Sequence, residues 1–130
     1  MDSISKDPNG YSPGDIIARL KRCIDSGIEG IDYTFKQRDK NEELFRKYNI
    51  TTKKRREILY SLTEDDYVRW DYSNNASFNE VVYFFEKTVQ LIPRFIEDAK
   101  EVRVELYIKL TWNDETNGVL VVISFHEKEY

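Results

Sequence analysis

The chain has few of the residues that build disulfide-bonded or metal-bound scaffolds. Its 130 residues include one cysteine, Cys23, and one histidine, His126. One cysteine cannot form an internal disulfide, and together these two residues are too few for a structural zinc site. The first residues are polar, and no apolar run approaches the roughly 20 residues of a membrane-spanning helix. We therefore expect a cytoplasmic protein without a metal or cofactor.

The chain also lacks an excess of positive charge. Lysine and arginine number 20 against 24 aspartate and glutamate residues, which gives a formal net charge of −4. Domains that bind nucleic acid through their overall charge are usually strongly basic, so such binding here would depend on a local patch. One basic run consists of Lys53, Lys54, Arg55 and Arg56. Most runs of this kind are solvated faces of helices.

The apolar residues are sufficient for one folded domain. Hydrophobic residues make up 40% of the chain, and a single domain usually takes about 100–200 residues. Helical spacing predicts helices over 13–26, 39–48 and 53–62, and alternation predicts strands over 31–35, 67–72, 81–87, 103–112 and 119–126. Turn-forming residues indicate a flexible arm over 1–12, and the stretch 88–100 is expected to be a loop with a short helix around 94–98.

These elements predict an α+β fold in which N-terminal helices pack on a twisted antiparallel sheet that ends in a C-terminal β-hairpin. Side chains alternate between the two faces of a strand. If Leu106 and Ile108 face the core together with Val121 and Ile123, then Tyr107, Lys109 and His126 share the opposite face. One register places Glu105 opposite His126, and the next places Tyr107 there. The simpler alternative is a polar outer face without a function.

Short blocks of the sequence resemble the MqsR-type toxins of bacterial toxin–antitoxin pairs, endoribonucleases with a fold similar to the RelE and YoeB toxins. The resemblance covers about the C-terminal half of the chain, and the blocks occur in the family's order and spacing. They are Ile58-Leu59-Tyr60-Ser61-Leu62-Thr63-Glu64-Asp65-Asp66-Tyr67, Leu106-Tyr107-Ile108-Lys109-Leu110 and Val122-Ile123-Ser124-Phe125-His126-Glu127-Lys128.

This resemblance implies a RelE-like fold, mRNA as the substrate and a cognate antitoxin protein as the partner. No membrane is expected to take part, because the chain has no long apolar run. The family's proposed catalytic lysine falls at Arg69, its strand tyrosine at Tyr107 and its near-terminal basic residue at His126. A polar residue of the middle strand would fall at Asn79 or Glu80. The stretch 88–100 resembles an insertion relative to the family.

The same residues fit metal-independent cleavage of RNA. This chemistry needs a base for the 2′-hydroxyl proton, an acid for the departing 5′-oxygen and cations for the charged transition state. An imidazole ordinarily titrates near neutrality, which makes His126 the best candidate acid or base. Tyr107 could take the other role if a neighbouring cation lowers its pKa. Arg69 can hold a phosphate through paired hydrogen bonds, and Lys109 adds a point charge.

Further residues are candidates for RNA binding. Lys53, Lys54, Arg55, Arg56 and Lys128 would contact phosphates without selecting a sequence. Unpaired bases could stack on Trp70, Tyr72 and Phe78, although aromatic residues at this density more often belong to a core. The competing hypothesis is a non-catalytic protein-binding or regulatory module of a phage or mobile element on the same fold. That module would tolerate replacement of His126 and Tyr107.

Overall fold

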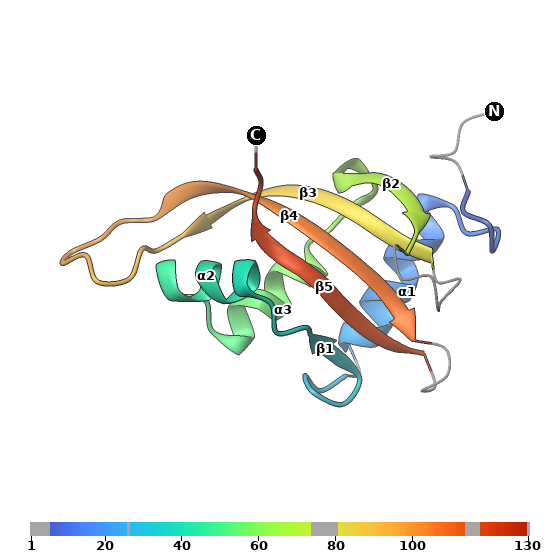
Figure 1. Cartoon of the computed structure of the whole chain (residues 1–130), viewed down its shortest axis with the longest axis horizontal. Helices are drawn as coiled ribbons and strands as arrows, with labels where there is room; N and C mark the ends of the chain where they lie inside the picture. Colours follow the sequence, from blue (N-terminus) through green and yellow to red (C-terminus); the bar gives the residue numbers. More distant parts are fainter. Residues whose placement is uncertain (1–5, 26, 74–80, 114–117, 130) are drawn as a thin grey trace.

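A computed structural model describes residues 6–25, 27–73, 81–113 and 118–129, which form a helical layer and a sheet (Figure 1). The strands form a five-stranded sheet in the order β1-β5-β4-β3-β2. The elements are α1 (Pro13–Asp25), β1 (Tyr33–Phe35), α2 (Asp39–Lys47), α3 (Thr52–Tyr60), the 3-10 helix η1 (Glu64–Asp66), β2 (Tyr67–Tyr72), β3 (Val81–Leu91), β4 (Val102–Asn113) and β5 (Val119–Glu127). The predicted α+β class is confirmed, and none of the described helices is long and apolar enough to span a membrane.

The sheet is mixed, so the prediction of a purely antiparallel sheet is wrong at one edge. β1 pairs in parallel with β5, with Tyr33 opposite Leu120 and Phe35 opposite Val122. The other neighbouring strands are antiparallel. The strand expected over 31–35 is present as the 3 residues of β1, but alternation along a strand does not indicate whether it pairs in parallel or antiparallel with a distant segment.

The core lies between the sheet and the helices α1 and α3, which lie behind the sheet in Figure 1. Leu20 of α1, Leu59 of α3 and both Leu106 and Ile108 of β4 are 0% exposed. Burial of a side chain of this size contributes about 1.5–3 kcal/mol. These contacts fix which side of the sheet is the inner face. The opposite side, which carries Tyr107 and Lys109, is called the outer face below.

β5 buries a different set of residues from the one expected. Leu120, Val122 and Phe125 are 0% exposed, whereas Val121 and Ile123 are only partly buried. Lys109 pairs with Ser124 and Leu110 pairs with Val122, which leaves Ile123 as an extra residue on β5. This β-bulge shifts the alternation by one position. The expectation that Val121 and Ile123 face the core is therefore wrong, while Phe125 does face it.

The long β3–β4 hairpin replaces the expected loop and short helix. β3 continues to Leu91, which pairs with Val102 at the start of β4. Residues 94–98 form turns instead of a helix, and both Phe95 and Asp98 have positive φ, at 63° and 53°. Arg94 holds the hairpin against α2 by donating from Nε to the carbonyls of Phe45 and Tyr48, each at 2.9 Å. Strand pairing and this anchor outweigh the local preference for a helix.

Part of the predicted arm, residues 1–5, lies outside the described residues, as do residues 114–117 in the link between the two strands of the expected C-terminal hairpin. Residues 6–12 make a turn against the sheet. The Asp7 carboxylate is buried and accepts hydrogen bonds from the Tyr83 hydroxyl and from the backbone amides of Asn9 and Tyr11. Burial and this carboxylate together raise the pKa of Tyr83, so the phenol remains the proton donor.

Candidate active site on the outer face of the sheet

Tyr107 and His126 lie side by side on the outer face of β4 and β5. The register pairs Tyr107 with His126, and their ring centroids are 5.3 Å apart. Of the two registers that the sequence left open, this one holds. On the other side of Tyr107, β3 places Glu86 opposite it. A carboxylate, a phenol and an imidazole therefore form one row across the sheet.

A second row, one step along the strands, carries positive charge. The Arg69 guanidinium lies 3.9 Å from the centroid of the Phe84 ring, and Lys109 Nζ lies 5.4 Å from the same centroid. Lys109 pairs across the sheet with Ser124. Arg38, the residue before α2, donates from Nη1 to Ser124 Oγ at 3.1 Å. Arg38, Arg69 and Lys109 are called the cationic cluster below.

The hydrogen bond of His126 defines the roles of its ring nitrogens. Its Nδ1 is 2.8 Å from the carbonyl oxygen of Glu127. A carbonyl only accepts hydrogen bonds, so Nδ1 carries the proton, and in the neutral ring Nε2 is left as an acceptor. An imidazole held in this tautomer can take a proton at Nε2.

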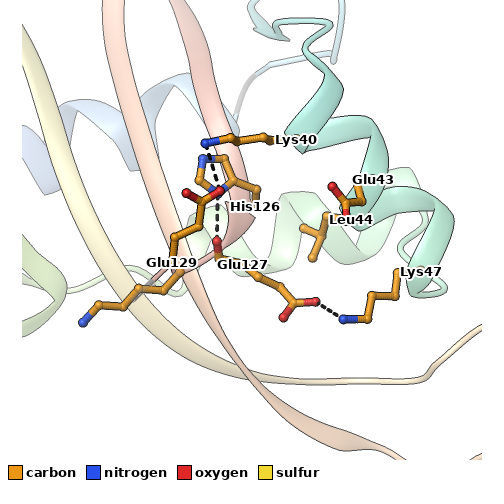
Figure 2. A pocket seen from close by; sticks show the side chains of 8 residues that line it. Lys40, Glu43, Leu44, Lys47, His126, Glu127 and Glu129 are labelled. Atoms are coloured by element: carbon orange, nitrogen blue, oxygen red, sulfur yellow. Dashed lines mark hydrogen bonds and ion pairs between the residues drawn. The ribbon is translucent and has the colours of Figure 1, made fainter.

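His126 also lines a pocket of about 230 Å³ between β5 and α2 (Figure 2). The rim of this pocket carries both charge signs. Lys40 pairs with Glu129 at 2.9 Å, and Lys47 pairs with Glu127 at 2.8 Å. One side of the His126 imidazole therefore faces this pocket, and the other side of the ring faces Tyr107.

Burial dominates the electrostatics of Tyr107. It raises the pKa of the phenol, and Glu86 raises it further, while Arg69 and Arg38 oppose this shift only in part. The sequence suggested that Tyr107 acts as an acid or base if a neighbouring cation lowers its pKa. Arg69 and Arg38 are such cations, and both lie close enough to lower it. Because burial outweighs them, the phenol keeps its proton at neutral pH and is suited to donate it.

Lys109 is in an unfavourable environment for a cation. Burial lowers its pKa most, and the charges of Arg38 and Arg69 lower it further. Within the described residues, neither Lys109 nor Arg38 forms an ion pair with a carboxylate, and Arg69 has only the exposed partner Asp71 at 3.0 Å. Among the described residues, the cationic cluster of three positive side chains therefore has one carboxylate partner, Asp71.

The basic run lies elsewhere, on α3 in the helical layer. Arg55 makes paired hydrogen bonds to the Glu29 carboxylate at 2.6 and 2.5 Å, and its guanidinium lies over Phe35 and Phe45. Arg56 donates to the carbonyl of Ile24 near the end of α1 at 2.9 Å. These cations hold the helical layer together. Lys53 is exposed and Lys54 is half-buried.

The remaining candidates fall into different places. Lys128 forms an ion pair with Glu86 at 2.9 Å, next to the row of Tyr107 and His126. Trp70 pairs with Tyr83 and packs against the core, and Tyr72 lies on the same side of β2 as Trp70. These rings are thus on the face opposite Arg69. Phe78, Asn79 and Glu80 lie outside the described residues.

Sequence reasoning missed Arg38 and Glu86. Glu86 could have been identified as a site residue. It lies two positions after Phe84 on β3, so both side chains are on one face, and the β3–β4 register places Glu86 opposite Tyr107 on that face. Arg38 gives no such signal. It reaches the outer face only because β1 runs alongside β5 and brings the start of α2 next to Ser124.

The outer face thus combines an imidazole nitrogen able to accept a proton, a phenol able to donate one and a cluster of three cations with one paired carboxylate among the described residues. This set can bind an anion and move protons around it. None of the protein-family models, curated proteins and solved structures compared with the chain matches it. The function is therefore argued from the geometry of the outer face.

Proposed function

We propose that this protein is an endoribonuclease that cleaves mRNA without a metal, and that it acts as the toxin of an MqsR-like toxin–antitoxin pair with a RelE-like fold. One observation carries the proposal. Tyr107 and His126 are cross-strand neighbours, with ring centroids 5.3 Å apart, on the face that also carries Lys109 and Arg69. The resemblance places the family's catalytic tyrosine at Tyr107, its near-terminal basic residue at His126 and its catalytic lysine at Arg69; Lys109 has no such counterpart and is a candidate through its charge alone.

The reaction follows from the protonation states of these side chains. His126 accepts the proton of a ribose 2′-hydroxyl at Nε2, and the 2′-oxygen attacks the adjacent phosphorus. The bond between phosphorus and the 5′-oxygen breaks as Tyr107 donates its phenolic proton to that oxygen. The products are a 2′,3′-cyclic phosphate and a 5′-hydroxyl, and proton exchange with water restores both side chains. Lys109 and Arg69 stabilise the negative charge that builds up on the phosphate.

RNA contacts outside the reacting phosphate would come from other cations at the surface, of which Lys53 is exposed and both Lys54 and Lys128 are half-buried. Lys128 lies beside the row that contains Tyr107 and His126, and Lys53 and Lys54 lie on α3. Arg55 and Arg56 are already engaged within the protein, so they contribute less to RNA binding than their charge suggests. Contacts of this kind position the chain of the RNA without selecting its sequence.

A second candidate function is that of a non-catalytic protein-binding module. The observation that favours it is the tip of the β3–β4 hairpin, which projects beyond the rest of the molecule in Figure 1. Phe95 is 96% exposed and Ile96 is 61% exposed at this tip. Neighbouring exposed apolar side chains favour contact with a protein. An antitoxin would use such a surface too, so this observation alone does not separate the two functions.

Cleavage of a long RNA in EDTA separates them. The purified protein is expected to cut the RNA, and both His126→Ala and Tyr107→Phe should slow the cut by roughly 10²–10⁴-fold, the usual contribution of acid–base catalysis. Tyr72→Phe, which removes the hydroxyl of an exposed tyrosine on the other side of the sheet, should cleave normally. Circular dichroism should show the same fold for all variants.

The products and the partner complete the test. Cleavage by this mechanism leaves a 2′,3′-cyclic phosphate, which blocks labelling of the 3′ end until acid opens the ring and phosphatase removes the phosphate. If the wild-type protein leaves RNA intact, or if both variants cleave at the wild-type rate, the nuclease proposal fails. The binding-module function is then supported if Phe95→Ser, and not His126→Ala, abolishes complex formation with the product of the neighbouring gene.

A further inference from the structure

Arg38 occupies a position that its own local structure does not require. It is the residue before α2, it is exposed, and its side chain does not cap that helix. Its guanidinium instead extends over the edge of β5, where Nη1 donates to Ser124 Oγ at 3.1 Å. Ser124 is the cross-strand neighbour of Lys109. The chain thus places a guanidinium beside an ammonium with no carboxylate of the described residues paired to either.

Like charges held together raise the free energy of the folded protein unless a counterion is present. The effect is visible at Lys109, whose pKa is lowered by burial and then by Arg38 and Arg69. Arg69 adds to the same charge from the other side, above the buried ring of Phe84. A surface that concentrates one sign of charge in this way attracts and holds ligands of the opposite sign.

We propose that Arg38, Lys109 and Arg69 together bind the sugar–phosphate backbone of a single-stranded nucleic acid, with Arg38 as a phosphate-binding residue. This inference rests on the proposed nuclease function and deepens it. Arg69 comes from β2, and Arg38 is attached at β5. At about 4.8 Å between neighbouring strands, the cluster extends over roughly 14 Å of sheet. An isolated phosphate ion is too small for that length, whereas successive phosphates of one strand follow it.

The geometry also favours Arg38 over a more mobile cation. A guanidinium has a planar set of donors, and only Nη1 of Arg38 is used by Ser124. The remaining N–H groups can bind phosphate oxygens in pairs. Ser124 thus acts as a positioning residue that holds the guanidinium over the sheet, next to Lys109 and one step along the strands from His126.

Single-stranded DNA is the probe, because it has the backbone but no 2′-hydroxyl and cannot be cleaved by the proposed mechanism. We expect a short fluorescein-labelled strand to bind the wild-type protein, with an affinity that falls as salt increases. Arg38→Ala should weaken binding about tenfold, as expected when a charged hydrogen-bonding group is removed. It should also reduce the slope of log K against log salt by about 0.7, the value for one neutralised phosphate on a single strand.

Arg103→Ala is the matched control. Arg103 is an exposed cation on the same face of β4 as Lys109, but it lies farther along the hairpin, opposite Gln90. Its replacement should leave both the affinity and the salt slope unchanged. Arg38→Lys should keep the salt slope, because the charge remains, while it weakens binding because the paired hydrogen bonds cannot form.

The outcomes keep this inference apart from the nuclease proposal. If Arg38→Ala retains the affinity and slope of the wild type, Arg38 is not a phosphate-binding residue, whether or not RNA is cleaved. If the strand binds through Arg38 but RNA stays intact, the phosphate site stands and the nuclease function fails. A melting temperature of Arg38→Ala that is equal to or above that of the wild type shows that weaker binding does not come from a disrupted fold.

Discussion

The residues of the outer face are arranged for binding at some expense to stability, and Lys109 is the clearest case. Its ammonium is half-buried, lies close to other cations and has no carboxylate partner among the described residues. Tyr107 is different, because burial keeps its phenol protonated without any charge being buried. Conflicts of this kind, in which a side chain lowers stability but supplies a ligand contact, are typical of functional sites.

Lys109→Met should therefore make the protein more stable at neutral pH while weakening its binding of single-stranded DNA. The pKa of Lys109 is lowered in the fold from the ordinary 10.5, so its charged form is disfavoured there relative to the unfolded chain. This penalty is present at neutral pH and disappears as the pH rises through the lowered pKa toward 10.5. The gain in melting temperature over wild type should shrink across that range.

Thermal unfolding at several pH values measures this effect. Arg103→Met is the control, because it removes an exposed cation from the same strand face and should leave the melting temperature unchanged. A Lys109→Met variant that is less stable than wild type at neutral pH would show that the cationic cluster is balanced by a group other than a bound anion.

At the scale of elements, strand alternation predicts that Tyr107 and His126 share a face, because both segments are long and strongly apolar on one side. Alternation left two registers open, and the structure selects the one that pairs these two residues. The bulge at Ile123 could not be predicted from alternation. It is compensated by a side chain from another element, since Asn41 of α2 continues the hydrogen bonding of β5 where β1 has ended. Its amide donates to the Ile123 carbonyl at 3.0 Å, and its Oδ1 accepts from the Phe125 amide at 2.8 Å.

Asn41→Leu should destabilise the protein by about 2–4 kcal/mol, because it leaves those backbone groups of β5 buried without partners. Asn41 is 0% exposed, so water does not take the place of its amide. Urea unfolding followed by circular dichroism measures the change. Glu43→Ala, at an exposed position of the same helix, should change stability by less than about 0.5 kcal/mol. An equally small effect of Asn41→Leu would show that β5 does not depend on this amide.

At the scale of the whole molecule, the sequence predicts the layers but not how its charges are distributed between them. Helical spacing and alternation give the α+β class, and the bounds of β2 agree with the expected 67–72. The cations are separated by long-range packing that local patterns do not encode. Arg55 and Arg56 are bound within the helical layer, whereas Arg38, far from Arg69 in the sequence, joins it on the outer face.

This separation predicts that ligand length decides which cations matter. Replacing both Lys53 and Lys54 with alanine should leave the affinity for a short single-stranded DNA unchanged, because such a strand is held on the outer face by Arg38, Lys109 and Arg69. The same double variant should bind a long RNA less tightly, with a salt slope that is smaller by about 0.7 for each phosphate that α3 no longer binds. Fluorescence anisotropy with both ligands measures this. If the double variant instead binds the short and the long ligand equally weakly, α3 belongs to the primary binding site. Catalysis and backbone binding could then no longer be assigned together to one face of the sheet.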